Sequence, residues 1–476
     1  MLQRGSEPMK PVQAINRTYD EITVGDTASE VRTITADDLV LFAHASGNLN
    51  PIHLPGKQGE GDDEEAVAPG MLIASLFSSV LGNKLPGPGT LYRRQTVRFA
   101  ARARVGDTLT VTMTAKLKLA DNVVVFDGRV VNQDGTVVAE GEAEVIAPTQ
   151  RMTLDDVALP VLSLRRQVKF DRLIAACSGL PALPTAVIHP CDQASLAGPI
   201  EAAKAGLIVP VLVGPRPRIE KVAAEHGIDI SGVEIVETPH SHASAERAVA
   251  LVHEGRVRAL MKGALHSDEV LHEVVKRDGG LRTKRRISHA FVLDAPGINH
   301  LLIVTDAAIN ILPDLLTKAD IVQNAIDLAR AIGIEKPKVA VMSAVETVNP
   351  AIPSSVEAAA LSKMAERGQI TGGIVDGPLA MDNAIDLDAA RTKGITSVVA
   401  GRAEVLVVPN LEAGNMLAKN LTFVARADAA GLVLGARVPV MLTSRADDAR
   451  ARMASAALAV LYEHWLTTGV SAVKAA

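Results

Sequence analysis

The spacing of apolar residues changes between residues 150 and 170, and this change divides the chain into two differently built parts. Before it, apolar runs of strand length follow one another with only short turns between them. After it, short β-branched runs alternate with stretches of helical spacing. Strands joined by tight turns form antiparallel sheets, whereas alternating strands and helices are typical of parallel sheets. The sequence therefore predicts two domains of different fold class.

The first part is predicted to be an α+β domain over residues 10–150, in which an antiparallel sheet wraps one helix. Residues 70–82 have the apolar character of a buried helix. Residues 57–65 are dominated by Gly, Asp and Glu and predict a solvated loop. A linker over 151–165 has no core pattern. The predicted strands span residues 90–100, 108–119, 123–132 and 136–146.

The second part, residues 166–476, is predicted to be an α/β domain in two lobes. Lobe one takes residues 166–300 and 440–476, and lobe two takes 301–439. Polar residues follow the predicted strands, and because parallel sheets bind ligands beyond the carboxyl ends of their strands, these residues predict one cleft. They are Asp192, His266, Asp306, Glu346, Asp376, Asn410 and Ser444.

Composition limits the function classes. Aromatic residues make up only 2% of the chain, so Ala, Val, Leu and Ile must build the core. A net charge of −5 offers no electrostatic footprint for nucleic acid. Cys177 and Cys191, the only cysteines, belong to no metal-spaced cluster. Neither a signal peptide nor a membrane-spanning run is recognisable, so we expect a cytoplasmic protein without a membrane partner.

The segment 440–448 combines a hydroxyl, a guanidinium and two carboxylates where an apolar run gives way to a helical pattern. The run 431–442 predicts a buried strand, and the recurrence of Met453, Ala457, Leu461 and Trp465 every four residues predicts a helix face behind it. Ser444 and Arg445 could hold an anion at the start of that helix. Alternatively, Ser444 and Asp447 form a capping box with a purely structural role.

The second part resembles the phosphate acetyl/butyryltransferase family, particularly its butyryl-type branch. The matching text lies at residues 304–310, 333–340, 376–383, 412–415 and 442–447. The resemblance implies a two-lobed fold of the isocitrate/isopropylmalate dehydrogenase type. It also implies exchange of the acyl group of a short-chain acyl-CoA, such as acetyl-CoA or butyryl-CoA, with inorganic phosphate. Acyl phosphate and free CoA are the products, and neither a metal nor a bound cofactor is implied.

By this resemblance, Ser444 donates a hydrogen bond to the oxyanion that forms when phosphate attacks the thioester. Arg445 holds the phosphate bidentately. A carboxylate accepts the proton of the CoA thiol in the reverse direction. In acetyl-type relatives that base lies seven residues beyond the serine, which is Ala451 in this chain. Asp447 or Asp448 is therefore nominated instead, with both alternatives open.

Weaker signals nominate residues that bind phosphate or CoA. His266 and Arg286 follow successive predicted strands, and Arg286 belongs to a basic cluster with Arg282, Lys284 and Arg285. Such a cluster could bind the phosphates of CoA or form an ordinary solvated surface. Asn310 and Asn415 lie inside matching motifs, although asparagine is also common in loops.

The first part resembles the MaoC-like (R)-specific enoyl-CoA hydratases, which have the hot-dog fold. The resemblance rests on residues 42–53 and 68–75. The family motif Ser-Gly-Asp-x-Asn-Pro-x-His supplies an Asp and a His that activate water. His53 matches the His, but Asn48 stands in the Asp position, and Pro69 replaces a frequent His. An amide cannot exchange a proton at accessible pH, so we expect the domain to bind acyl-CoA but to hydrate it poorly.

Together these patterns predict a bifunctional fusion that assembles as a homo-oligomer. One alternative is a catalytically decayed acyl-CoA-binding or regulatory protein, although retention of Ser444 and Arg445 speaks against it. Another is a nicotinamide-dependent decarboxylating dehydrogenase. The sequence speaks against this alternative, because it has neither the Gly-x-Gly-x-x-Gly fingerprint of dinucleotide binding nor a metal-binding Asp cluster at one strand end.

Overall fold

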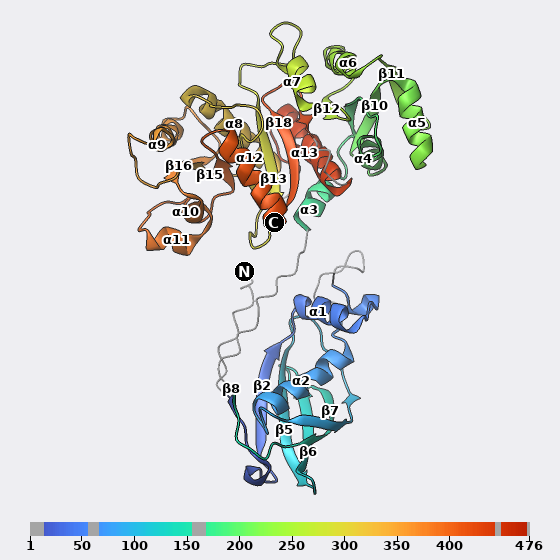
Figure 1. Ribbon diagram of the computed structural model, residues 1–476, viewed down its shortest axis with the longest axis vertical. Coiled ribbons are helices and arrows are strands. Elements are labelled where there is room, and N and C mark those ends of the chain that lie inside the picture. Colours follow the sequence, from blue (N-terminus) through green and yellow to red (C-terminus); the bar gives the residue numbers. More distant parts are fainter. Residues whose placement is uncertain (1–13, 56–65, 155–167, 443–448, 474–476) are drawn as a thin grey trace. The chain divides into compact units, whose positions relative to one another are not determined.

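The computed structural model describes residues 14–55, 66–154, 168–442 and 449–473. The chain divides into two compact units, Met1–Leu164 and Arg165–Ala476 (Figure 1). Each unit has its own hydrophobic core and is described separately below.

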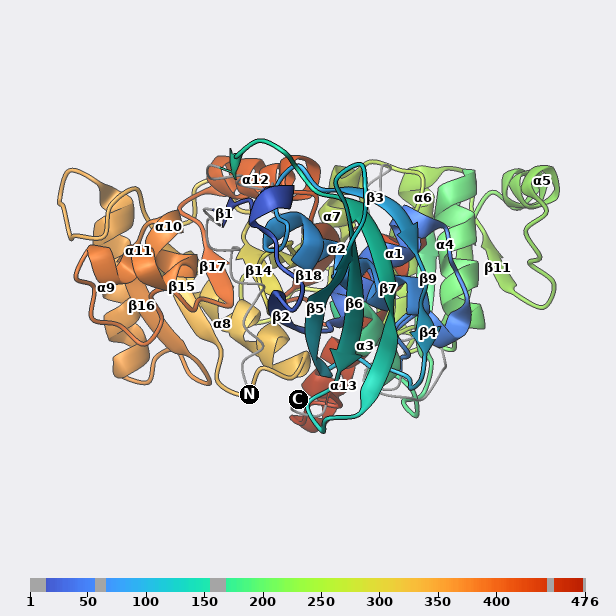
Figure 2. The ribbon, with the colours of Figure 1, turned by 90° about the horizontal axis from the view of Figure 1, so that it is seen from below.

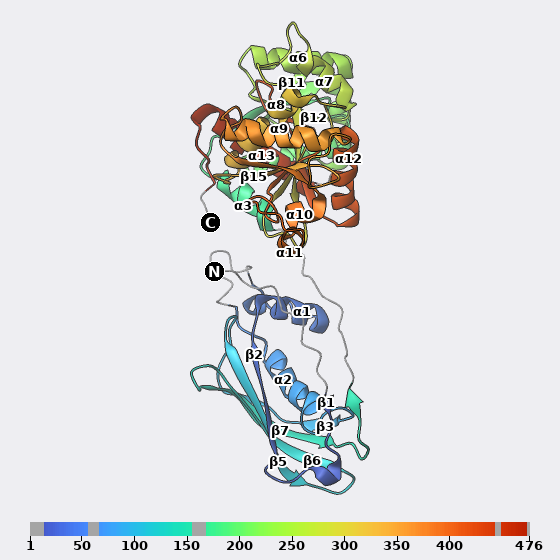
Figure 3. The same cartoon turned by 90° about the vertical axis from the view of Figure 1, so that its left-hand side faces the viewer.

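Unit 1 is an antiparallel sheet packed around a helix, as predicted (Figure 3). Helix α2 (Gly70–Asn83) buries Phe77, Val80 and Leu81 against the sheet. Strand β5 faces it with Leu109, Val111 and Met113, which alternate with more exposed residues. The sheet has the order β2 (Thr27–Thr33), β5 (Thr108–Lys118), β6 (Val123–Val131), β7 (Val137–Ile146) and β3 (Leu91–Gln95), and β4 (Arg98–Phe99) also pairs with β7.

Unit 1 departs from the prediction at three points. The predicted strand 90–100 is two strands, β3 and β4, because regular pairing with β7 is interrupted at Thr96 and Val97, which lie over Gly141. Thr96 stays bonded to β7, since its backbone N–H donates to the Glu142 carbonyl at 2.9 Å. A second helix, α1 (Ala36–Ser46), was not predicted; Thr35 and Asp38 form its capping box, and Gly47 ends it with φ of +72°.

The third departure is at the predicted linker. Strand β8 (Thr153–Leu154) lies within it and pairs with β1 (Ala14–Ile15). The predicted loop 57–65 lies outside the described residues.

Unit 2 is built on one eleven-stranded sheet with helices on both faces. Figure 2 shows β15, β16, α9 and α10 gathered at one end of this unit and β9, β11, α4 and α5 at the other. The strand order is β11 (Glu234–Glu237), β10 (Ile208–Gly214), β9 (Leu183–Ile188), β12 (Ala259–Lys262), β19 (Val440–Met441), β18 (Asp428–Leu434), β13 (Ser288–Asp294), β14 (Leu302–Thr305), β17 (Val405–Val407), β15 (Lys338–Met342) and β16 (Ile374–Leu379).

The helices of unit 2 mostly follow these strands in the chain. They are α3 (Val168–Ala176), α4 (Gln193–Lys204), α5 (Arg216–His226), α6 (Ser241–His253), α7 (Ser267–Val275), α8 (Leu315–Ala331), α9 (Pro353–Glu366), α10 (Met381–Ile385), α11 (Leu387–Thr392), α12 (Leu411–Lys419) and α13 (Ala449–Thr468).

Helices α8 and α13 cover the centre of one face of the sheet. Ala457 and Leu461 of α13 belong to the same core cluster as Ile326 of α8 and as Ala290 and Leu432 of the central strands. The four-residue recurrence in the sequence therefore predicted the helix correctly, although residues 454–462 are all buried rather than one face alone. Among the described residues, no helix is both long and apolar enough to span a bilayer.

The prediction of one strand over residues 431–442 is wrong. The run holds the end of β18 and the whole of β19, which are antiparallel to each other. Gly435 has φ of +80°, a left-handed conformation that favours glycine, and the chain reverses there. An apolar run thus hid a tight connection between two buried strands.

The strands of unit 2 do not all run in one direction, so the residues predicted to define one cleft follow strands that end at two edges of the sheet. Strand β19 runs parallel to β12 but antiparallel to β18, and β13 runs antiparallel to both β18 and β14. The carboxyl ends of β9 and β12 therefore face the opposite edge from those of β14, β15 and β17. Asp192 and His266 follow the first group, whereas Asp306, Glu346 and Asn410 follow the second, and Asp376 lies within β16.

Candidate functional sites

In unit 1, His53 lies on a cavity of about 580 Å³. The turn Pro51–His53 brings its ring close to Val67, and Nδ1 is 2.7 Å from the Val67 carbonyl oxygen. A carbonyl oxygen can only accept, so Nδ1 carries the hydrogen and Nε2 of the neutral ring remains the basic atom. The cavity is lined by Ile52, His53, Val67, Ala68, Gly70, Ile73, Phe99, Ala101, Arg102, Ala103, Arg104 and Val138.

Asn48 is placed differently from His53. Its side-chain oxygen accepts a hydrogen bond of 3.1 Å from the backbone N–H of Asn50, so it closes a local turn. It is exposed and is not among the described residues that line the cavity. The structure therefore brings one member of the predicted pair to the cavity and leaves the other in the turn before it.

In unit 2, the predicted basic cluster lines a cavity of about 480 Å³. The loop 282–287 before β13 forms one wall, and Ile309 and Asn310, which follow β14, form another. Val275 at the end of α7 and Asp320 on α8 complete the lining. We call this cavity the basic pocket.

The four cations of the basic pocket are not equivalent. Arg285 forms an ion pair with Asp327 of α8. Within the described parts of the chain, the side chains of Arg282, Lys284 and Arg286 make neither a hydrogen bond nor an ion pair. The backbone N–H of Arg286 donates to Asp320, at 2.9 Å, and this bond fixes the loop against α8. Three cations are thus available to an anion, against the carboxylate of Asp320 in the lining and that of Asp314, whose pKa is lowered by hydrogen bonds from Thr317 and, to a smaller extent, by Arg286.

Asp306 organises the loop that carries Asn310. Its side chain is buried, with 3% of the residue exposed, and it accepts hydrogen bonds at both oxygens. Oδ1 accepts from the backbone N–H groups of His289, Ala308 and Ile309 at 3.2, 3.0 and 3.1 Å, and Oδ2 accepts from the backbone N–H and the side-chain amide of Asn310 at 3.0 and 2.6 Å. The sequence predicted that Asp306 lines a ligand cleft. In the structure its carboxylate instead accepts hydrogen bonds from the backbone of the loop 308–310 and of β13.

Asn310 and Asn415 donate to the protein itself. Asn310 Nδ2 donates to Asp306 and also to the Ile287 carbonyl at 2.9 Å, so both amide hydrogens are used. Only its Oδ1 remains for a ligand, and Oδ1 accepts. Asn415 of α12 donates to the Ala307 carbonyl at 3.2 Å, which braces the same loop from the other side.

His266 lies apart from the basic pocket. It precedes α7, and its backbone N–H donates to Glu269 at 3.1 Å. Val275, at the other end of α7, lines the pocket. Nine helical residues rise by about 13 Å, so α7 separates His266 from the basic residues.

His289 lies on β13, where its backbone N–H donates to Asp306 of the loop 306–310. The sequence patterns did not nominate it. It is 1% exposed, its ring packs edge-on against Phe291, and Nδ1 has no hydrogen-bond partner. Burial lowers the pKa of the imidazole to about 4, although the Asp306 carboxylate raises it. The ring is therefore neutral at pH 7. A histidine inside an apolar strand carries no sequence signal that distinguishes it from a surface one.

The predicted catalytic residues Ser444, Arg445, Asp447 and Asp448 lie outside the described residues. The chain is described as far as Leu442, beyond β19, whose Met441 pairs with Met261 of β12. No group of three or more His, Cys, Asp or Glu side chains suited to a metal ion occurs in the described ranges.

Two family models match the chain. Residues 241–460 match "Phosphate acetyl/butaryl transferase", and residues 23–134 match "MaoC like domain". The phosphate acetyltransferase of Rhizobium meliloti is 65% identical over 294 residues, which are 62% of this chain and 93% of the relative. The phosphate butyryltransferase of Clostridium acetobutylicum is 41% identical over 292 residues, 61% of this chain and 97% of the relative.

A solved structure is similar to unit 2. The branched-chain phosphotransacylase from Enterococcus faecalis V583 is 29% identical, with a TM-score of 0.52. The match covers 59% of this chain and 99% of that one.

Proposed function

We propose that this chain, which belongs to the phosphate acetyl/butyryltransferase family, transfers a short acyl group between CoA and inorganic phosphate. The 65% identity over nearly the whole length of a phosphate acetyltransferase carries this proposal. An oxygen of phosphate forms a bond to the thioester carbonyl carbon, the carbon–sulfur bond breaks, and CoA leaves with the electron pair. The sulfur then takes up the proton that phosphate has lost.

The roles of the predicted catalytic residues remain our proposal. Ser444 donates a hydrogen bond to the oxyanion of the tetrahedral intermediate, and Arg445 orients the attacking phosphate. Asp447 or Asp448 carries the proton between phosphate and sulfur. A hydroxyl, a guanidinium and a carboxylate supply the three contributions that this reaction requires.

We further propose that the basic pocket holds the phosphates of CoA. The unpaired side chains of Arg282, Lys284 and Arg286 support this role, because three cations suit a polyanion better than a single orthophosphate. Asn310 Oδ1 would accept from a hydroxyl or amide of the ligand. Asn415 would act by positioning the loop 306–310. His266 would contact a different part of the substrate, since α7 separates it from the pocket.

Phosphate-dependent release of free CoA thiol from acetyl-, propionyl- and butyryl-CoA tests the transferase. Ser444→Ala should lower the rate by about 10²–10³-fold, the usual cost of an oxyanion donor. Ser231→Ala, in an exposed turn, is the matched control. Burial raises the pKa of Cys177 to about 12 and also raises that of Cys191, so native protein thiols stay unreactive in the assay. No release above the phosphate-free blank, from protein that still binds CoA, would leave the decayed acyl-CoA-binding protein as the correct interpretation. Equal release with and without phosphate would instead indicate thioester hydrolysis and would contradict the transferase.

We propose that unit 1 binds acyl-CoA at the His53 cavity but hydrates enoyl-CoA poorly. The match to a MaoC-like domain supports the binding. The amide of Asn48 supports the prediction of slow hydration, because an amide cannot act as an acid or a base. Asn48→Asp should raise crotonyl-CoA hydration by about 10²–10⁴-fold. The gain should vanish when His53→Asn is added. An unchanged rate in Asn48→Asp would contradict the proposal.

Three finer points also remain proposals. The division of unit 2 into two isocitrate dehydrogenase-like lobes agrees with the reversal of strand direction at its centre. Assembly into a homo-oligomer can be measured by light scattering. CoA esters and phosphate enter as substrates, without a bound cofactor.

A further inference from the structure

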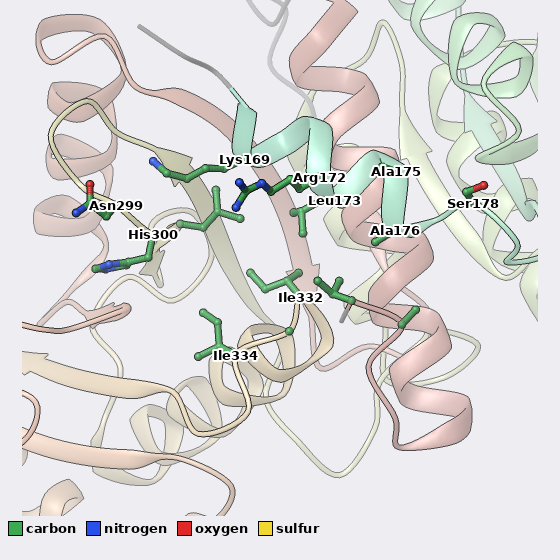
Figure 4. A pocket seen from close by; sticks show the side chains of 14 residues that line it. Lys169, Arg172, Leu173, Ala175, Ala176, Ser178, Asn299, His300, Ile332 and Ile334 are labelled. Atoms are coloured by element: carbon green, nitrogen blue, oxygen red, sulfur yellow. The ribbon is translucent and has the colours of Figure 1, made fainter. Parts of the chain in front are cut away.

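A second cavity in unit 2, of about 600 Å³, lies away from the basic pocket. Helix α3 lies on one side of it and the turn 332–334 after α8 on the other, as Figure 4 shows. Residues 299–301 before β14 and residues 472–473 near the end of the described chain complete the lining. We call it the α3 pocket.

The walls of the α3 pocket are mainly aliphatic. Leu173 is buried in the core, and Leu301, Ile334 and Val473 are partly buried and pack against the same core cluster. Ile332 is 5% exposed. Cavities of this size and lining bind small molecules with a substantial apolar part. The aliphatic walls therefore favour an alkyl chain over a sugar or a nucleotide.

One unpaired positive charge lies at the rim of this pocket. Lys169 is engaged, because its Nζ pairs with Asp294 and donates to the Ile298 carbonyl at 2.7 Å. His300 is also engaged, with Nε2 at 3.0 Å from the Ala403 carbonyl. Arg172 is exposed, and it has neither a hydrogen bond nor an ion pair within the described ranges. Figure 4 shows Lys169 and Arg172 extending from the same helix.

We propose that the α3 pocket binds an amphipathic monoanion, namely an aliphatic carboxylate. Its chain would lie against the aliphatic walls, and Arg172 would hold the carboxylate bidentately. This ligand differs from the polyanion suited to the basic pocket, where three unpaired cations meet few apolar side chains. The inference does not depend on the proposed transferase activity.

Trp465 gives a built-in reporter for this pocket. It is the only tryptophan of the chain, and the Arg330 guanidinium lies over its ring at 4.6 Å from the centroid. Arg330 precedes the lining residue Ile332 by two positions. A ligand against Ile332 should therefore change the fluorescence of Trp465.

The experiment titrates the full chain with octanoate, followed by Trp465 fluorescence and by calorimetry. We expect saturable binding that Arg172→Gln weakens at least tenfold. Arg367→Gln, which removes an exposed arginine outside the pocket, should leave it unchanged. Octanol and octylammonium should bind wild type at least tenfold more weakly. Ala176→Phe, which fills the cavity, should abolish octanoate binding while phosphate-dependent CoA release stays normal.

Three results would overturn the proposal. The first is the absence of both heat and fluorescence change with octanoate. The second is equal affinity in Arg172→Gln and wild type, and the third is equal affinity of octanol and octanoate. An unchanged midpoint of guanidinium unfolding in each variant, followed by Trp465 fluorescence, shows that the result does not arise from misfolding.

Discussion

Replacing Asp306 by Asn should destabilise unit 2 far more than its small change in size suggests. An asparagine has one oxygen, which can take the place of Oδ1 and keep the three backbone donors. Its NH₂ group then faces the backbone N–H and the side-chain amide of Asn310, so two hydrogen bonds become donor–donor contacts. A buried hydrogen bond to a charged group is worth about 1.5–3 kcal/mol. Relief of the buried charge offsets part of the loss, and we expect a net cost of about 2–4 kcal/mol.

Guanidinium unfolding of the full chain, followed by Trp465 fluorescence, measures this cost. The signal reports on unit 2 alone, because the chain has no other tryptophan. The matched control is Asp386→Asn at the start of α11, where an exposed carboxylate accepts from the Ala389 N–H at 2.7 Å. Asparagine caps helices as well as aspartate does, so the control should change stability by only a few tenths of a kcal/mol. A loss below about 1 kcal/mol in Asp306→Asn would refute the view that this carboxylate holds the loop.

Two further predictions concern pH and packing. Because burial lowers the pKa of His289 to about 4 while an unfolded histidine titrates near 6.5, protonation favours the unfolded chain. The unfolding free energy of unit 2 should therefore fall as pH drops from about 6.5 towards 4, and less steeply in His289→Gln; equal slopes would contradict this. In unit 1, a Cβ on Gly141 would lie 1.9 Å from the Thr96 carbonyl oxygen, so Gly141→Ala should cost about 1–3 kcal/mol in calorimetric unfolding. Gly82→Ala, at an open position in α2, should instead stabilise by about 0.5–1 kcal/mol, and similar melting of the two variants would count against the assigned contact.

Local patterns predicted the elements whose residues repeat with a clear period. Strand β5 is of this kind, since it buries alternate residues. Helix α13 was found from a four-residue recurrence, although its middle turns, residues 454–462, are buried on every side. Helix α1 escaped prediction because only Leu39 and Ala43 of its residues are buried. The direction of β18 relative to β13 could not be predicted, because it is set by pairing between residues more than 130 positions apart.

The sequence predicted which residues belong to the candidate sites, but not which partners their side chains contact. His53 and the basic loop were found from motifs, and both line cavities. Asn310 was predicted to bind phosphate or CoA, but no sequence pattern shows that both of its amide hydrogens are already used inside the protein. The role of Asp306 could not be predicted for the same reason. A sequence does not distinguish a buried aspartate that accepts backbone hydrogen bonds from one that binds a ligand.

The basic loop shows why charge counting cannot replace structure at such a site. In the sequence Arg285 and Arg286 are equivalent neighbours. In the structure α8 separates their roles, because Asp327 pairs with the Arg285 side chain whereas Asp320 holds only the Arg286 backbone. The ion pair with Asp327 offsets the charge of Arg285 in the pocket, but it also ties the loop to α8. This contact orders the backbone from which Arg286 extends. A guanidinium held on an ordered backbone loses less conformational entropy when it binds an anion. The Arg285–Asp327 pair therefore supports anion binding by Arg286 without taking part in it.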